Sequence, residues 1–214
     1  MNTSKLVRIA IILAVITIVY NLAEGLVSVF FGIEDETLAL LGFGVDSFVE
    51  VLSGIGILHM LYRMKKSGVN DVASRDGFER QALRITGTAF YILVAGLLVG
   101  SVLNIVNEVK PETTLVGIII SSLSIATMYF LMTYKMKIGK QLNSDAIIAD
   151  ANCTKTCFYL SFVLLASSGL YALFGIAWFD IAGSLGIAWF AFSEGKEAFE
   201  KARSEKLSCS CECD

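Results

Sequence analysis

Six long apolar segments divide this chain of 214 residues, and they limit its possible folds more than any other feature. They cover roughly residues 6–32, 37–62, 82–106, 113–134, 144–173 and 177–195. A helix needs about 20 apolar residues to cross the hydrocarbon core of a bilayer, whereas a barrel strand is short and alternates apolar with polar residues. The segments are continuous, so the sequence predicts an all-α, polytopic membrane protein with a bundle of six transmembrane helices.

The composition agrees with a membrane protein and excludes several other classes. Hydrophobic residues make up 55% of the chain and charged residues 17%, against about 45–50% and 25% in soluble domains. The net charge of −3 gives no basic surface for nucleic acid. No cysteine falls in an outer connection, which argues against a disulfide scaffold. The first segment is too long for a cleaved signal peptide, and we expect it to remain as a membrane anchor.

The basic residues predict the orientation of the bundle. All but Lys110 and Lys155 of the 17 Lys and Arg residues fall on the side of the bundle that carries both termini. The connections on the opposite side hold a group of acids, namely Glu34, Asp35, Glu36, Glu108 and Glu112. Because positively charged connections stay in the cytoplasm, we expect both termini to be cytoplasmic.

Two pairs of metal-binding side chains lie inside the apolar segments. Asp46 and Glu50 are four residues apart in the second segment, and Cys153 and Cys157 are four residues apart in the fifth. Residues at this spacing share one face of a helix. Each pair begins roughly 14 Å from the membrane surface at which its helix enters, in a core about 30 Å thick. Antiparallel packing of the two helices would therefore bring all four groups to one level.

Two carboxylates and two thiolates form a mixed set of hard and soft ligands. Such a set favours zinc or a cadmium-like ion over magnesium or calcium. Metal binding requires the ligands to lose protons, so metal and protons compete for the same atoms. Two simpler interpretations stay open: a closed structural zinc site, or cysteines that only pack as small apolar side chains.

Other polar residues inside the segments are possible accessories to this site. Asp150, three residues before Cys153, could act as an accessory or entry-path acid, or form a helix–helix hydrogen bond. Lys155 faces roughly away from Cys153, and we expect it to pair with an acid on a neighbouring helix. Asn21 and Glu24 in the first segment could line an outward vestibule or pair with Lys155.

The last residues of the chain contain a second group of soft donors. Cysteines alternate with other residues near the end, at Cys209, Cys211 and Cys213. We interpret this tail as a site that captures a thiophilic metal in the cytoplasm. A disordered end without a function and a palmitoylated tail are the alternatives.

These residues together resemble the cation diffusion facilitator family of metal exporters. The second segment, from Thr37 to Glu50, is similar to the family motif S-x-A-L-x-A-D-A-x-[HD]-xxx-D, and the segment from Ser144 to Cys157 fits the same template more closely. "Asn21…Gly25" and "Trp178-Phe-Asp180" are also similar to the family, and we expect Asp180 to interact with a helix terminus rather than with metal.

The resemblance implies a transport site made of Asp46, Glu50, Cys153 and Cys157. The family usually has His and Asp at the positions of the two cysteines, so the metal preference is expected to be softer here. The cytoplasmic domain that usually follows the helices is missing from this sequence, which resembles a short variant. Family members are typically homodimers, so here we expect a homodimer that forms through the membrane helices.

The sequence thus predicts a divalent heavy-metal transporter that exports a zinc- or cadmium-like ion from the cytoplasm in exchange for protons. Residues 1–200 would form the six-helix transmembrane transport domain, and residues 201–214 a flexible Cys-rich cytoplasmic tail. We expect no enzymatic activity, no permanent cofactor, and a location in the plasma (inner) membrane of a prokaryote. The alternatives are a membrane thiol–disulfide oxidoreductase that uses Cys153 and Cys157, and a metal sensor without transport.

Overall fold

The computed structural model describes residues 3–35, 37–67, 77–112 and 114–204, which form six α-helices and, within these ranges, no strand. The helices are α1 (Thr3–Glu34), α2 (Leu38–Ser67), α3 (Gly77–Val106), α4 (Leu115–Leu142), α5 (Asp145–Phe174) and α6 (Trp178–Arg203). The prediction of an all-α bundle is confirmed.

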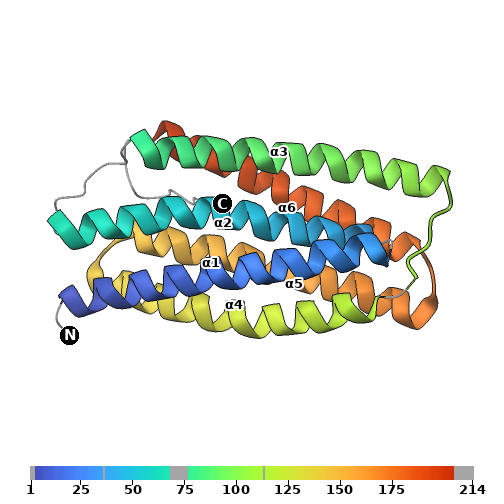
Figure 1. Cartoon of the computed structure of the whole chain (residues 1–214), viewed down its shortest axis with the longest axis horizontal. Helices are drawn as coiled ribbons and strands as arrows, with labels where there is room; N and C mark the ends of the chain where they lie inside the picture. The colour runs from blue at the N-terminus through green and yellow to red at the C-terminus, as the bar shows by residue number, and fades with distance from the viewer. Residues whose placement is uncertain (1–2, 36, 68–76, 113, 205–214) are drawn as a thin grey trace, which may run out of the picture.

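The helices lie side by side along the long axis and alternate in direction (Figure 1). At one end, the left end of Figure 1, α1, α3 and α5 begin and α2, α4 and α6 end. We call this the inner end, because the basic residues gather there, and the opposite end the outer end. The predicted cytoplasmic side corresponds to the inner end.

Helices α1 to α5 are long and apolar enough to cross a bilayer, as predicted for them. Helix α6 is also long enough to span a bilayer, but its second half carries charged residues. Among the described helices it is therefore less apolar than the other five. It packs against α3 and α5, which shield one side of it. Several of its charged side chains are buried there, so α6 depends on its neighbours more than on lipid.

Two helices continue beyond the apolar segments that predicted them. Helix α4 runs to Leu142, so Lys135, expected in a connection, lies within the helix. Helix α6 runs to Arg203, so the first residues of the predicted tail are helical, and Lys201 is buried. Residues 205–214, with the three tail cysteines, lie outside the described residues.

Glycines allow α1 and α2 to approach each other closely. A Cβ atom on Gly44 would lie 2.7 Å from the backbone nitrogen of Val29, and one on Gly32 would lie 2.6 Å from that of Leu41. Both distances are shorter than real Cβ contacts. Small residues therefore fix the spacing of the helix that carries Asp46, as is common between membrane helices.

The interior contains three apolar clusters, and a polar layer lies between the two largest; the third is small and packs Met128 and Leu131 of α4 against Cys157 of α5. One cluster, which includes Leu6, Met64 and Leu142, packs α1, α2, α4 and α5 at the inner end. A second cluster, which includes Leu40 and Ile187, packs α2, α3, α5 and α6. The buried polar layer contains Thr17, Asn21, Glu24, Asp46, Ser47, Ser124, Thr154, Ser161 and Glu194.

Asp180 connects the outer ends of α6 and α2. Its carboxylate accepts hydrogen bonds from the backbone N–H groups of Leu38, at 2.9 Å, and Ala39, at 3.2 Å. These N–H groups belong to the first turn of α2, where a helix has donors without internal partners and favours a negative charge. Asp180 interacts with a helix terminus as expected, although the terminus belongs to α2.

Candidate functional site

The acids of α2 and one thiol of α5 come together in the polar layer. Asp46 is 3% exposed and Cys157 is 6% exposed. The Glu50 carboxylate lies within hydrogen-bonding reach of the Cys157 thiol, and both Asp46 and Glu50 interact electrostatically with that thiol. Three of the four predicted ligands thus lie in one region, because α2 and α5 are neighbours in the bundle.

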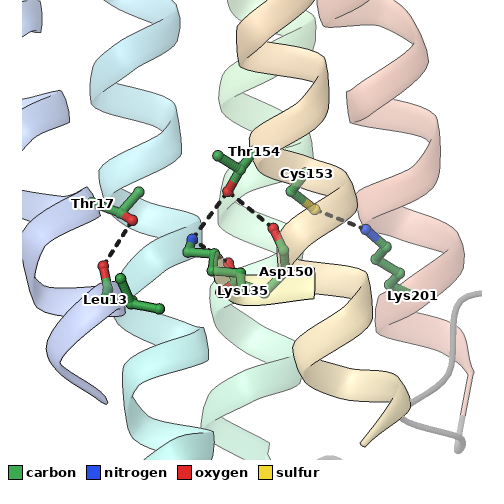
Figure 2. A network of polar contacts seen from close by, with 7 residues as sticks. All are labelled: Leu13, Thr17, Lys135, Asp150, Cys153, Thr154 and Lys201. Carbon is green, nitrogen blue, oxygen red and sulfur yellow. Dashed lines mark hydrogen bonds and ion pairs between the residues drawn. The ribbon is translucent and has the colours of Figure 1, made fainter. Parts of the chain in front are cut away.

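Cys153 is directed toward a different neighbour. Lys201 of α6 donates a hydrogen bond from Nζ to Cys153 Sγ over 3.2 Å, as Figure 2 shows. The thiol also interacts electrostatically with Glu50. Cys153 therefore lies at the edge of the region around Glu50, and its sulfur is in contact with a cation in this conformation.

No three His, Cys, Asp or Glu side chains in the described ranges are grouped closely enough to hold a metal ion. Asp46, Glu50, Cys153 and Cys157 lie in one neighbourhood, but their atoms do not form a finished coordination shell. Small rotations of side chains or helices would be needed to close it. The four-ligand assignment therefore stays a prediction.

Cys153 borders a cavity at the inner side of the polar layer. The cavity has a volume of about 40 Å³ and is lined by residues of α2, α3, α5 and α6, including Ser53, Glu79, Asp150 and Lys201. A water molecule needs about 10–15 Å³ by the same measure, so the space holds about three waters. The cavity places about three water molecules beside the Cys153 sulfur, in the inner half of the bundle.

Glu194 of α6 was not predicted as a site residue, yet it belongs to this region. It is 9% exposed and interacts electrostatically with Asp46, Glu50 and both thiols. It also lies within hydrogen-bonding reach of Thr156. The signal in the sequence was an acid at the end of the sixth apolar segment, which looked like the start of the charged tail.

Glu24 of α1 extends the acidic region toward the outer end. Its carboxylate accepts hydrogen bonds from Tyr20 Oη at 3.0 Å and Ser47 Oγ at 3.1 Å. Within the described part of the chain, the buried amide of Asn21 has no hydrogen-bond partner for either side-chain atom, nor does Asp46 Oδ1. Buried polar atoms without partners are unusual in proteins. The predicted accessory role of Glu24 stays a prediction, and the unpartnered atoms mark its surroundings as incomplete without water or an ion.

On the inner side, acids are paired with cations. Lys135 of α4 is 3% exposed and donates hydrogen bonds to Asp150 Oδ1 and Thr154 Oγ1, each over 3.0 Å (Figure 2). Arg63 forms an ion pair of 2.7 Å with Glu79, which lines the cavity. Asp150 therefore joins α5 to α4, as one of the two interpretations expected, and it also lines the cavity, whereas its role as an accessory acid stays a prediction.

The prediction that Lys155 pairs with an acid on a neighbouring helix is wrong. Lys155 lies on an exposed face of α5, and its Nζ is 5.6 Å from the centre of the Tyr159 ring. Two residues along a helix turn a side chain by about 200°, so the face opposite Cys153 is the outside of the bundle. The same geometry keeps Lys155 from serving as the partner of Glu24.

The region thus contains carboxyl groups and a thiol in a buried environment, although they do not surround a single point. Buried carboxylates without a cation are costly, and a dication would offset the charges of two of them. Hydroxyl groups from Tyr20, Ser47 and Thr156 surround the acids and provide further oxygen atoms. This chemistry fits the passage of a divalent cation.

Comparison with known proteins agrees with this geometry. The family model described as the cation efflux transmembrane domain matches residues 10–205. A protein of Methanocaldococcus jannaschii with the name "uncharacterized transporter" is 27% identical over 183 residues, which are 83% of this chain and 64% of that protein. The chain thus spans less than two thirds of this relative's length. Because the match covers nearly all the described helices, the resemblance noted in the sequence is confirmed, and the chain belongs to the cation efflux family of membrane transporters.

Proposed function

We propose that this cation transporter exports a thiophilic divalent cation, Zn²⁺ or Cd²⁺, from the cytoplasm in exchange for protons. The ligands would be Asp46, Glu50, Cys153 and Cys157. The observation that supports this most is the approach of Glu50 on α2 to the Cys157 thiol on α5 inside the polar layer. A sulfur ligand beside a carboxylate favours zinc-like ions over magnesium or calcium.

Exchange for protons follows from the chemistry of these ligands. A thiol or carboxyl group loses its proton when it binds a metal ion, and proton return weakens the metal bond. Asp46, Glu50 and Glu194 interact electrostatically, so they cannot all remain charged at low cost without a cation. Metal and protons would thus neutralise the site in turn, on opposite sides of the membrane.

The direction of transport rests on the two sides of the site. The cavity beside Cys153 faces the inner end, where we place the cytoplasm because of the basic residues. Glu24, Asn21 and Asp46 lie toward the outer end and present oxygen atoms. An ion would enter past sulfur and leave past oxygen, from which a thiophilic ion dissociates more easily.

We also propose the remaining features of the assembly, of which the homodimer follows from the family resemblance and metal capture from the soft donors of the tail. They are a homodimer formed through the membrane helices, the plasma membrane of a prokaryote as the location, and metal capture by Cys209, Cys211 and Cys213. Dimer formation is tested by the mass of the detergent-solubilised complex, and capture by the metal content of a chain with the three cysteines changed to serine.

Flux measurements in proteoliposomes test the main proposal. We expect Zn²⁺ and Cd²⁺ transport, stimulated by a pH gradient, with little flux of Mg²⁺ or Ca²⁺. Asp46→Asn should reduce the flux at least about 100-fold, because a lost ligand also leaves the others incomplete. Glu200→Gln is the matched control, since Glu200 is 65% exposed and pairs with Lys196 on an outward face of α6.

Serine variants of the cysteines test the role of sulfur. Cys157→Ser replaces a soft donor by a hard one and should reduce Cd²⁺ flux more than Zn²⁺ flux. If Cys157→Ser reduced the Cd²⁺ flux and the Zn²⁺ flux by the same factor, sulfur ligation would be contradicted. Transport by Asp46→Asn at the rate of the original chain would contradict the site. A reversible Cys153–Cys157 disulfide whose formation tracks activity would instead favour the oxidoreductase.

A further inference from the structure

We infer that Lys201 acts as a tethered competing cation: it occupies the Cys153 sulfur in the metal-free carrier and gives way when the transported dication binds. This inference rests on the proposed function, because it concerns the same site. It adds a residue that sets the apparent affinity for the ion, which neither the sequence nor the family match assigns.

The first observation is the placement of the ammonium group. Lys201 is 9% exposed, and its Nζ lies 3.2 Å from Cys153 Sγ (Figure 2). Both residues line the same cavity. An ion that arrives through this cavity therefore meets a cation already in contact with the first sulfur on its path.

The second observation is that the Lys201 ammonium group and a metal dication cannot both stay at the Cys153 sulfur at low cost. Zinc binds thiolate at about 2.3 Å, so an ion on Cys153 would lie at most about 5.5 Å from Nζ at its present position. Like charges within about 4–6 Å disfavour each other strongly where water is scarce. The bound dication would drive the ammonium group away.

The third observation is that Lys201 has a second partner on its own helix. Its Nζ forms an ion pair of 2.7 Å with Glu197 Oε1, one turn earlier on α6. Glu197 is about one-third exposed, so a lysine that keeps this ion pair while it leaves Cys153 moves toward the inner surface. The Lys201 side chain can leave Cys153 and keep its ion pair with Glu197. Replacement of the lysine by the metal ion therefore does not leave a buried cation without a counter-charge.

Competition of this kind lowers the apparent affinity for the metal. If Lys201 occupies the sulfur in about nine of ten empty carriers, the apparent dissociation constant is about tenfold larger than the intrinsic one. Removing the ammonium group should therefore tighten binding. Deleting a polar residue that touches a binding site usually weakens binding, whereas here the deletion is expected to strengthen it.

Equilibrium binding of Cd²⁺ to the full chain in detergent tests the inference, with the ultraviolet absorption of the Cd²⁺–thiolate bond as the readout. Lys201→Met and Lys201→Gln should each bind Cd²⁺ about tenfold more tightly than the original chain, and Lys201→Arg should bind as the original does. Lys196→Met is the control, because Lys196 pairs with Glu200 over 3.8 Å on an exposed face of the same helix.

A change of Glu197 supplies a second test, in which Cd²⁺ binding is expected to weaken. Glu197→Gln removes the alternative partner, so Lys201 should stay on Cys153 and Cd²⁺ binding should weaken about threefold to tenfold. In the Lys201→Met background the same change should have little effect, because Glu197 then has no lysine to receive. Glu197→Gln also keeps the inference testable if the neutral Lys201 variants fail to fold.

The outcomes separate this inference from the proposed function. If Cys153→Ser binds Cd²⁺ as the original chain does, the assignment of Cys153 as a ligand fails. If Cys153→Ser loses binding while Lys201→Met binds no more tightly than the original, the competing role of Lys201 is wrong and the transport site stands. Unchanged binding in Glu197→Gln would also overturn the competing role.

Discussion

The acids on the inner and outer sides of the polar layer have different partners. On the inner side Asp150 is bonded to Lys135, and Glu197 to Lys201. On the outer side Glu24 is bonded to the hydroxyl groups of Tyr20 and Ser47. The inner charges are therefore compensated within the protein, whereas the outer carboxylate has only neutral donors among its described hydrogen bonds.

This difference indicates where a transported cation stabilises the protein most. An ion at the inner side must displace a lysine, whereas one near Asp46 and Glu24 meets acidic side chains that have no cation beside them in their described hydrogen bonds. Buried charges are stable only when they are paired and hydrogen-bonded. We expect the inner side to behave as a structural network and the outer side to respond to bound cation.

The largest expected effect is on the inner side, in Lys135→Met. The change leaves Asp150, which is 13% exposed, without its cation, and this costs about 3 kcal/mol in the free energy of unfolding, the lower end of the range for a broken buried pair. Denaturation in detergent measures the loss. In the double variant Lys135→Met/Asp150→Leu most of the stability should return, because no lone charge is left. A loss below about 1 kcal/mol in the single variant would show that the pair contributes little.

Glu24→Gln should have the second largest effect, and on transport rather than stability. The glutamine keeps an acceptor for Tyr20 or Ser47 but removes the negative charge from the outer side. We expect metal flux to fall about tenfold, equal to about 1.4 kcal/mol, with thermal stability kept. Flux at the original rate, measured beside Glu200→Gln, would remove Glu24 from the ion path.

Tyr20→Phe tests the hydroxyl donors directly. The change removes one of the hydroxyl donors to Glu24 and should cost about 1 kcal/mol in stability, the usual contribution of one hydrogen bond. In the Glu24→Gln background the cost should be smaller, because a neutral acceptor forms a weaker bond. Equal costs in both backgrounds would mean that the charge of Glu24 does not strengthen this bond.

The smallest effect is expected for Lys155→Met, which lies outside both networks. Its contact with the Tyr159 ring is exposed, and such a contact contributes about 0.5–1 kcal/mol. Stability should change by less than about 1 kcal/mol, and flux should not change. A strong loss of flux would mean that Lys155 reaches an acid of the site during transport.

The sequence predicted the bundle and the meeting of α2 with α5 for clear physical reasons. Apolar segments of more than 20 residues admit few folds, and spacing of four places Asp46 with Glu50, and Cys153 with Cys157, on one helix face. The orientation of each helix about its axis was not available from spacing. That rotation decides that Cys153 contacts Lys201 and that Lys155 lies outside.

The ends of the helices were also hard to predict. Lys135 and Lys201 follow apolar segments and looked like parts of connections, but helices α4 and α6 continue through them. Long cationic side chains near a helix end can reach acids on a neighbour while their stems stay among apolar groups. Charge alone therefore could not separate a buried ion pair from an exposed end.

The bonds of Asp180 to the first turn of α2 give the bundle a fixed point at one end. From Asp180 to Arg203 helix α6 extends about 35 Å at 1.5 Å per residue. A tilt of about 5° around this fixed point would carry the far end of α6 sideways by about 3 Å. That displacement is close to the 3.2 Å between Lys201 and Cys153, so a very small change of angle is enough to make or break that bond.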